Sequence, residues 1–520
     1  MRCDISTEKF SQDVLPASFL VDRADVPKLC DAVLSIAALG YSEDYVRERL
    51  GLDDLGNLQW RSVPIYRAER LASRDPLALA IDLFLFQGIL TAQELDRLFP
   101  ACESEVLIRA GVLTIDEMGQ GSARASLFPV GNRLIFSDRA WPQLSYPAYS
   151  EVPSDQVMWV GLDSRFLARC TVRRPRRAAL DLCTGSGVHA LLASSHADRV
   201  FAVDINPRAV DCARFNAEAS GVANLEVKAG DLFEAVGGES FDLITANPPF
   251  VPSPLDTLRF RDGGRSGEDV LTRVIAGLPH HLAPGGMAQV VTELGERDDE
   301  PLAQRLREWL NGAPMDIHLL RLGEYTAMRY AIGHAQGDDY PAFLASIDEW
   351  ARNLRAQNYV RIVSALISFE WSDPAFGPPW DRIDESAPPR RDAGTEIDAA
   401  FSAERLARGI DWQHVLKRSW LSRAGPIALL DAQVLGSGLR ARAKASLLGQ
   451  ALKIDHQLDP VEREVLAHMN GRVLAPELIK TLSDHDLDEQ SVVEATRSLL
   501  RLGLVRIDGS FVSSPKMASS

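Results

Sequence analysis

The sequence predicts an α/β core with a doubly wound, parallel sheet, together with smaller α+β domains at both ends of the chain. Between about residues 157 and 371, short apolar runs alternate with helical segments, which is the pattern of strands joined by crossover helices. Acidic or glycine-rich residues follow successive runs, at the edge where such sheets bind their ligands. The length of 520 residues is too great for one hydrophobic core, so we expect several domains.

Changes in composition along the chain indicate four parts. We expect a helical domain over residues 1–150, the α/β domain over 151–372, a linker over 373–398 and a second helical domain over 399–520. The linker is predicted because this stretch is rich in Pro, Asp and Arg, a composition typical of extended spacers. Its prolines are Pro374, Pro378, Pro379, Pro388 and Pro389.

The N-terminal domain is predicted to contain helices followed by a β-hairpin. Residues 124–136 predict the hairpin, because the turn residues Gly131 and Asn132 separate two apolar arms. Three helices followed by a hairpin is the outline of a winged helix, a form of helix-turn-helix. The three expected helices lie at Leu77–Phe86, from Thr91, and from about Ser104 to Gly111, and a further helical stretch at 26–56, closed by Gly51, precedes them.

A similar outline is predicted near the C-terminus, so we expect winged-helix-like domains at both ends. Helices begin at Pro460, Pro476 and Asp488, and a strand follows at Leu504–Ile507. The third of these helices is acidic where it starts, whereas phosphates bind best to a positive helix start. A protein-contact or substrate-lid role is therefore favoured over nucleic-acid binding. The acidic residues are Asp488, Glu489 and Glu494, and the basic Arg497 and Arg501 come only late.

The overall charge and the cysteine pattern restrict the class of protein. A formal charge of −16 argues against a broad, non-specific grip on nucleic acid, although a local basic face stays open. No apolar run is as long as a membrane span, and the first residues carry acidic groups without an apolar signal core. Six scattered cysteines without a CxxC pair indicate reduced thiols and no metal site. We therefore expect a cytoplasmic protein that has no membrane partner.

The first two strands of the core are followed by residues suited to a nucleotide-like ligand. Strand 178–182 runs into Cys183–Gly187, where Gly185 and Gly187 let the backbone come close to a bound group. Strand 200–203 ends in Asp204, which is placed to hold the two hydroxyls of a ribose. Both features also suit a nicotinamide dinucleotide, so an oxidoreductase stays open on this evidence.

The next two strands add features that a nicotinamide enzyme does not require. Asp231 follows the third strand and could accept a hydrogen bond from an adenine amino group. The run Phe241–Ala246 leads into Asn247-Pro248-Pro249-Phe250, where two prolines end the strand and force a rigid turn. The turn holds the Asn247 carboxamide and the Pro248 carbonyl as fixed acceptors, with Phe250 as a flat wall beside them. Such a site suits a planar substrate that carries an N–H₂ group.

Residues 178–295 resemble a class I S-adenosylmethionine-dependent methyltransferase, a Rossmann-like enzyme, of the kind that methylates amino groups. Within this class the chain is most similar to HemK-type glutamine methyltransferases and their small methyltransferase relatives, which include ribosomal RNA guanine methyltransferases. The motifs that carry the resemblance are Asp181–Gly187, Asp204–Pro207, Asp231–Leu232 and Asn247–Phe250, followed by Arg261–Gly267 with its Asp-Gly-Gly pattern and by His281–Gly286.

The resemblance implies S-adenosylmethionine as the cofactor. Gly185 and Gly187 would flank its amino-acid end, Asp181 would lie near its amine, Asp204 would hold the ribose, and Asp231 the adenine. The catalytic set would be Asn247, Pro248, Pro249 and Phe250. In it, Asn247 and the Pro248 carbonyl orient the acceptor nitrogen for direct in-line transfer and Phe250 stacks on the acceptor. The expected cofactor-binding set is completed by Thr184, Ile205, Leu232 and Asn247.

The chain departs from the HemK pattern outside this region. A winged-helix-like domain stands where the substrate domain is expected, a helical segment over residues 323–358 precedes the last strand at 359–369, and a C-terminal domain is added. The acceptor therefore stays open between a macromolecule, either an RNA base or a protein glutamine, and a small planar metabolite. The alternative of another class is a winged-helix DNA-binding regulator with a non-catalytic methyltransferase-like domain.

Overall fold

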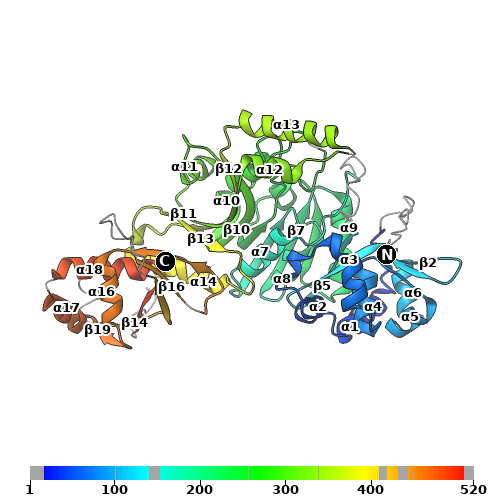
Figure 1. Ribbon diagram of the computed structural model, residues 1–520, viewed down its shortest axis with the longest axis horizontal. Coiled ribbons are helices and arrows are strands. Elements are labelled where there is room, and N and C mark those ends of the chain that lie inside the picture. The colour runs from blue at the N-terminus through cyan, green and yellow to red at the C-terminus, as the bar shows by residue number, and fades with distance from the viewer. Residues whose placement is uncertain are drawn as a thin grey trace, which may run out of the picture. The chain divides into compact units, whose positions relative to one another are not determined.

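The computed structural model divides the chain into two compact units, whose elements are labelled in Figure 1. The first unit comprises residues 1–168, 175–282 and 327–359, and the second comprises residues 169–174, 283–326 and 360–520. The structure describes residues 17–99, 101–139, 153–255, 257–337, 339–408, 419–430, 443–447, 449–485 and 487–508. The expected domain boundary at residues 150 and 151 lies outside these ranges. Within them, no helix is both long and apolar enough to cross a membrane.

The first unit contains the parallel sheet of the α/β core. Its strands have the order β8-β7-β6-β9, and each neighbouring pair is parallel. This arrangement confirms the α/β core that the alternation of strands and helices predicts. The elements are β6 (Arg176–Leu182), α8 (Val188–Ala193), β7 (Ala197–Asp204), α9 (Pro207–Ala219), β8 (Leu225–Ala229), η6 (Leu232–Val236), β9 (Phe241–Ala246) and α10 (Asp269–His281).

The N-terminal part of this unit begins with helices that agree with the sequence pattern. Gly51 ends α2 with a φ of 68°, a left-handed conformation that glycine adopts without strain. Thr91 caps α5 and forms a capping box with Glu94. The elements are α1 (Val26–Ala38), α2 (Glu43–Leu50), η1 (Leu55–Asn57), η2 (Trp60–Ser62), α3 (Val63–Ile65), η3 (Tyr66–Arg70), α4 (Pro76–Ala80), η4 (Ile81–Leu85), β1 (Ile89–Leu90), α5 (Ala92–Leu98), α6 (Ala101–Arg109), β2 (Leu113–Ile115) and β3 (Gly121–Ala123).

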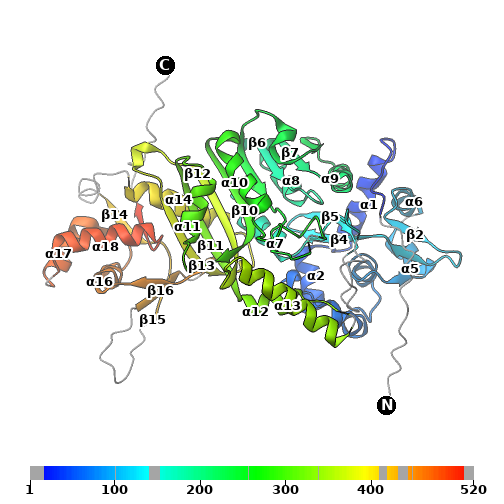
Figure 2. The ribbon, with the colours of Figure 1, turned by 90° about the horizontal axis from the view of Figure 1, so that it is seen from above.

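The predicted hairpin is confirmed, but it is separate from the small antiparallel sheet of order β1-β3-β2. Strands β4 (Ala125–Val130) and β5 (Arg133–Asp138) pair across the turn at Gly131-Asn132. The hairpin packs against α8 and α9 of the core (Figure 2). For example, the rings of Phe136 and Phe215 lie 5.3 Å apart in an edge-to-face contact. The N-terminal segment and the two core helices thus share one hydrophobic core.

The expected helical insertion is also part of the first unit. It consists of α12 (Ala327–His334) and α13 (Tyr340–Ala356), which pack against each other (Figure 1). The imidazole of His334 stacks on Tyr330 within α12 and contacts Trp350 of α13, and burial lowers the pKa of His334 to about 4. The two helices are therefore held together by a neutral aromatic cluster.

The second unit carries long strands that differ from the predicted parallel arrangement. Strand β12 (Arg361–Trp371) is antiparallel to both β10 (Leu282–Glu296) and β11 (Met315–Thr326). A buried strand reads as a continuous apolar run in either direction, so the sequence pattern does not distinguish the two. Helix α11 (Leu302–Trp309) lies between β10 and β11 in the chain.

Residues 373–398, where we expected a linker, instead contain regular structure. They hold η7 (Pro374–Phe376), β13 (Asp381–Ala387) and the first residues of α14 (Gly394–Arg408). Strand β13 pairs in parallel with β11, and Trp380 just before it is buried. The prolines flank the strand rather than interrupting it, so its hydrogen bonds form.

The C-terminal helices begin where the sequence indicates, and Asp488 caps the third. That helix packs on α14, where Arg497 donates to the carbonyl of Ala407 and Arg501 pairs with Glu404. The assignment of either end of the chain to the winged-helix class stays a prediction. The elements are β14 (Trp420–Arg423), β15 (Ile427–Leu430), β16 (Ala443–Leu447), β17 (Lys453–Ile454), β18 (His456–Leu458), α16 (Pro460–His468), β19 (Val473–Leu474), α17 (Ala475–Ser483), α18 (Glu489–Arg501) and β20 (Val505–Asp508).

Candidate functional site

A cavity of about 750 Å³ lies at the carboxyl ends of β6, β7, β8 and β9. This position is where open α/β sheets bind ligands, and the volume is typical of small-molecule sites. The cavity brings together most of the residues that the sequence analysis singled out. Those that line it are Thr184, Gly185, Asp204, Ile205, Asp231, Leu232, Asn247 and Pro249, whereas Asp181, Gly187, Pro248 and Phe250 do not.

Asp181 lies beneath the glycine loop rather than facing the cavity. Its side chain is almost fully buried and accepts hydrogen bonds from the hydroxyls of Thr184 and Thr245, at 2.5 and 2.8 Å. Burial raises the pKa of Asp181 to about 7, although the two hydroxyl groups oppose this shift. Asp181 thus supports the loop after β6 and joins it to β9.

The two glycines of the loop after β6 serve different purposes. Gly185 has a φ of 53°, and a Cβ at this position would meet nothing within 4 Å, so the glycine leaves room on the cavity side. Gly187 has a φ of 82°, and a Cβ there would lie 3.1 Å from the Cβ of Ala213 in α9. Gly187 therefore allows α8 and α9 to pack closely, which explains why it does not line the cavity.

Asp204 links the first two loops of the site. One carboxylate oxygen accepts from the backbone N–H of Gly185 at 2.8 Å, and the other accepts from that of Asn206 at 2.9 Å. Burial raises the pKa of Asp204, and these two hydrogen bonds counteract part of the rise. The carboxylate therefore fixes the glycine loop in addition to lining the cavity.

Asp231, at the end of the third strand, has a partner that the sequence analysis missed. Its carboxylate accepts from the guanidinium of Arg273 in α10 at 2.8 Å, and both side chains are partly exposed. Arg273 lines the cavity and neutralises one of its acidic residues. No strand or motif marks Arg273 in the sequence, because it is an arginine within a helix, away from the ends of the core strands.

The carboxamide of Asn247 is held in a defined orientation. Its nitrogen donates to the carboxylate of Asp163 at 2.9 Å and to the hydroxyl of Ser164 at 3.1 Å, both in the first turn of α7 (Leu162–Cys170). Its oxygen has no hydrogen-bond partner within the described residues, so it remains an acceptor for a ligand. Burial raises the pKa of Asp163, and the hydrogen bond from Asn247 opposes the rise.

The turn after β9 packs against the Asp-Gly-Gly loop. The backbone N–H groups of Phe250 and Val251 both donate to the carbonyl of Arg261. A Cβ at Gly263 would lie 2.7 Å from the Pro249 carbonyl oxygen, and one at Gly267 would lie 2.4 Å from that of Phe250. Only glycine fits at these positions, so the two motifs form one structural unit.

An aromatic pair supplies the apolar wall that was expected from Phe250. Trp159 and Phe260 both line the cavity, with ring centroids 6.2 Å apart in an edge-to-face arrangement. Neither residue stands in a motif, and they come from irregular segments before β6 and after β9. Sequence reasoning could have found Asp163 and Ser164 as polar residues that open a helix, but not these two aromatics.

Two family models match the chain. Residues 159–309, which include all the residues described above for this site, match the methyltransferase small domain. Residues 38–126 match a domain of unknown function (DUF7059), which covers most of the N-terminal helices and the sheet β1-β3-β2.

Curated proteins similar to the chain include three glutamine methyltransferases. A putative protein N5-glutamine methyltransferase of Methanocaldococcus jannaschii is 37% identical over 25% of this chain and 68% of its own length. A ribosomal protein uL3 glutamine methyltransferase of Bradyrhizobium diazoefficiens is 37% identical over 25% of this chain and 46% of its own length. A release factor glutamine methyltransferase of Geobacter sulfurreducens is 33% identical over 26% of this chain and 53% of its own length. The chain thus spans about half the length of the last two relatives.

Proposed function

The chain belongs to the class I S-adenosylmethionine-dependent methyltransferases of the HemK type, and we propose that it methylates the side-chain nitrogen of a protein glutamine. The orientation of Asn247 carries this proposal. With its nitrogen held by Asp163 and Ser164, its oxygen is available to accept a hydrogen bond from an N–H₂ group. A carboxamide is planar and offers two such N–H groups.

The cavity residues fit S-adenosylmethionine. When bound, the cofactor supplies a methyl group on a positively charged sulfur. Asp204 and Asp231 offer carboxylate oxygens for hydroxyl and amino groups, and the open space at Gly185 admits a ligand close to the backbone. The proposed assignments are therefore Asp204 to the ribose, Asp231 to the adenine and the loop around Gly185 to the amino-acid end.

The residues around Asn247 would position the acceptor. We assign the Asn247 oxygen, in the cavity lining, and the Pro248 carbonyl, from the next residue outside that lining, as acceptors for the two N–H bonds of the glutamine, and together they would fix the plane of its carboxamide. Trp159 and Phe260 provide apolar surface that would exclude water from the reacting nitrogen. The rate enhancement would come mainly from this positioning, because the methyl donor is already reactive.

The flanking domains support a protein acceptor over a nucleic acid. In α18 the late basic residues Arg497 and Arg501 contact α14 within the chain. In the N-terminal region, α6 packs against α1, where Glu103 accepts from Ser35 and Arg109 pairs with Asp25. If both regions are winged-helix-like, as we propose, the helices that would read a nucleic acid are already occupied. The formal charge of −16 also disfavours phosphate binding.

The named relatives act on ribosomal protein uL3 and on a release factor. By analogy, we propose a cytoplasmic protein as the acceptor, and not an RNA base or a small planar metabolite. The non-catalytic regulator is disfavoured because Asp204, Asp231 and Asn247 are assembled around one cavity.

A labelling experiment tests this proposal. The purified protein is first titrated with S-adenosylmethionine and, as a control, with NAD; only the first should bind. It is then incubated with methyl-labelled cofactor and separate protein, RNA and small-metabolite fractions of a cell extract, with Asn247→Ala as the matched inactive variant. The label should enter protein with the wild type alone. Transfer to RNA or to metabolites would contradict a glutamine acceptor.

A further inference from the structure

One wall of the cavity has no regular secondary structure. Residues 153–160 form turns and irregular backbone, and several of them line the cavity. Backbone groups of such a segment need hydrogen-bond partners elsewhere to be held in one conformation. The lining residues of the segment are Ser154, Gln156, Val157, Met158, Trp159 and Val160.

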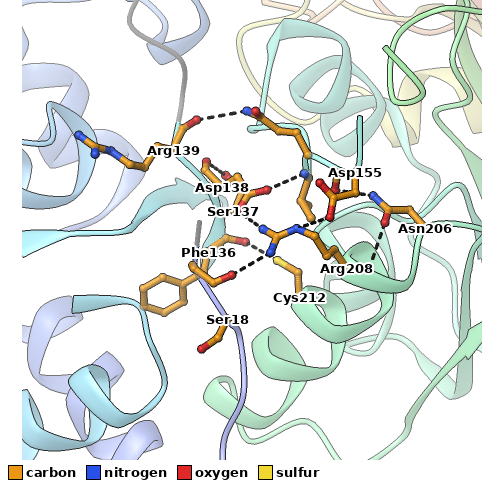
Figure 3. Close-up of polar contacts among 12 residues, drawn as sticks. Ser18, Phe136, Ser137, Asp138, Arg139, Asp155, Asn206, Arg208 and Cys212 are labelled. Carbon is orange, nitrogen blue, oxygen red and sulfur yellow. Dashed lines mark hydrogen bonds and ion pairs between the residues drawn. The ribbon is translucent and has the colours of Figure 1, made fainter. Parts of the chain in front are cut away.

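The segment is anchored on both of its sides, as Figure 3 shows. The backbone N–H of Val157 donates to a carboxylate oxygen of Asp138 at 2.8 Å. The side chain of Gln156 reaches the carbonyl of Arg139 at 3.4 Å, and Asn206 donates to the carbonyl of Asp155 at 2.8 Å. The anchors therefore come from the end of β5 and from the loop between β7 and α9.

Asp138 itself is held by a residue of α9. Its other carboxylate oxygen accepts from the guanidinium of Arg208 in α9, which also lies 3.5 Å from the carboxylate of Asp155 (Figure 3). Asp138 is 6% exposed, so this pair is shielded from solvent. Arg208 lies in the first turn of α9, two residues after Asn206 and four after Asp204 at the end of β7. The Asp138 carboxylate thus connects the cavity wall with the start of α9.

The position of β5 is set independently of Asp138. The side-chain oxygen of Asn216 in α9 accepts from the backbone N–H of Phe136 at 2.8 Å, and its nitrogen donates to the Phe136 carbonyl at 2.7 Å. The same nitrogen lies 2.9 Å from the carbonyl of Ser186 in the glycine loop. The fully buried Asn216 side chain therefore holds the edge of β5 against the cofactor-binding core, and Asp138 projects from this fixed strand.

We propose that Asp138 is a positioning residue for the cofactor cavity. Through Asp138, the N-terminal region of the chain holds residues 153–160 in place as one wall of that cavity. Asp138 acts through Val157 and does not itself line the cavity. The inference rests on the proposed function only in that the ligand of the cavity is S-adenosylmethionine. It assigns to the N-terminal region a part in cofactor binding, in addition to any contact with the acceptor.

Two variants and one control test the role of Asp138. Asp138→Ala removes the acceptor for the Val157 N–H, whereas Asp138→Asn keeps an acceptor oxygen. The matched control is Asp82→Asn, because Asp82 is 4% exposed and pairs with Arg67 and Arg74 in the N-terminal region. Within the described part of the chain, Asp82 forms no hydrogen bond or ion pair with residues 153–160. The first measurement is hydrogen exchange of the peptide spanning 153–161, which requires no cofactor. The second is the affinity for S-adenosylmethionine.

Asp138→Ala should speed exchange at Val157 by about tenfold or more and weaken cofactor affinity by about tenfold, the effect of one lost buried hydrogen bond. The kcat at saturating cofactor should stay within about twofold of the wild type. Asp138→Asn should recover part of both losses, and Asp82→Asn should leave both measurements unchanged. Equal exchange and affinity in Asp138→Ala and the wild type would overturn the inference, as would the same changes in Asp82→Asn. A wild type that fails to bind S-adenosylmethionine would instead overturn the proposed function, since the exchange comparison does not depend on it.

Discussion

The Asn247 carboxamide donates to the carboxylate of Asp163 at 2.9 Å, across 84 residues of chain. In the proposed function this contact decides which end of the carboxamide faces the methyl acceptor, because a carboxylate accepts hydrogen bonds and cannot donate them. An Asn247 side chain without this partner could rotate and present its nitrogen instead. Asp163 therefore gives the Asn-Pro-Pro-Phe motif the polarity that an N–H₂ substrate requires.

Asp163→Ala should lower kcat by about tenfold to a hundredfold, because Asn247 loses the partner that orients it, while cofactor affinity changes little. Asn247→Ala should lower kcat by about a hundredfold to a thousandfold, which is the usual effect of deleting one oriented polar group in a catalytic site. Steady-state kinetics with a methyl acceptor checks both values. The double variant should be no slower than Asn247→Ala; additive losses would show that Asp163 acts by another route.

Asp204→Ala should weaken the binding of S-adenosylmethionine much more than it lowers kcat. The variant loses the acceptor for the N–H groups of Gly185 and Asn206, and with it the shape of the glycine loop. Asp204→Asn retains one acceptor and should bind with intermediate affinity. Calorimetric titration measures all three proteins, and an Asp204→Ala affinity equal to that of the wild type would refute the ribose assignment.

Asn353 in α13 should matter for acceptor turnover although it does not line the cavity. Its nitrogen donates to the carbonyls of Pro252 and Arg265 at 3.0 and 2.9 Å, which holds the Asp-Gly-Gly loop against the turn after β9. Asn353→Ala should lower kcat/KM for the acceptor several-fold with cofactor affinity intact. Arg352→Ala is the neighbouring control, because Arg352 is exposed and bonds only within its helix among the described contacts. Equal effects of Asn353→Ala and Arg352→Ala on kcat/KM would exclude a role for the Asn353 hydrogen bonds.

The raised pKa of Asp181 predicts a pH-dependent stability. In the folded protein this carboxyl has a pKa of about 7, whereas its ordinary value is near 3.8, so between these values the folded state holds a proton that the unfolded state has released. Its contribution to stability is therefore greatest at low pH and falls as the pH rises toward 7. Asp181→Asn removes this effect. When the pH is raised from 5 to 8, the free energy of unfolding of the wild type should therefore fall by roughly 2 to 3 kcal/mol more than that of Asp181→Asn. Urea denaturation of both proteins at the two pH values makes the comparison. Equal falls in the free energy of unfolding in the wild type and Asp181→Asn would refute the raised pKa of Asp181.

Much of the core was predictable because its strands are largely apolar runs that are followed within a few residues by glycine or proline. Strands β6, β7 and β9 and the residues that follow them illustrate this. The Gly131-Asn132 turn is equally local, and its hairpin was predicted correctly. In each case the signal lies within a few neighbouring residues.

The rest depends on contacts between distant segments, which a local pattern does not contain. Asp163 and Asp138 are ordinary acidic residues in the sequence, and only the fold brings them to Asn247 and Val157. Strand β13 was mistaken for a linker because its residues are mostly charged, and most of them stay partly or fully exposed. Such a strand lacks the apolar alternation on which strand prediction relies.

The most direct test of the central claim identifies the atom that is methylated. Protein labelled with methyl-labelled S-adenosylmethionine is hydrolysed completely in acid, which cleaves the side-chain amide and releases a methylated glutamine nitrogen as methylamine. Labelled methylamine is expected from the protein fraction with the wild type, and none is expected with Asn247→Ala. Label that remains on another amino acid, or that is found in RNA, would contradict that claim.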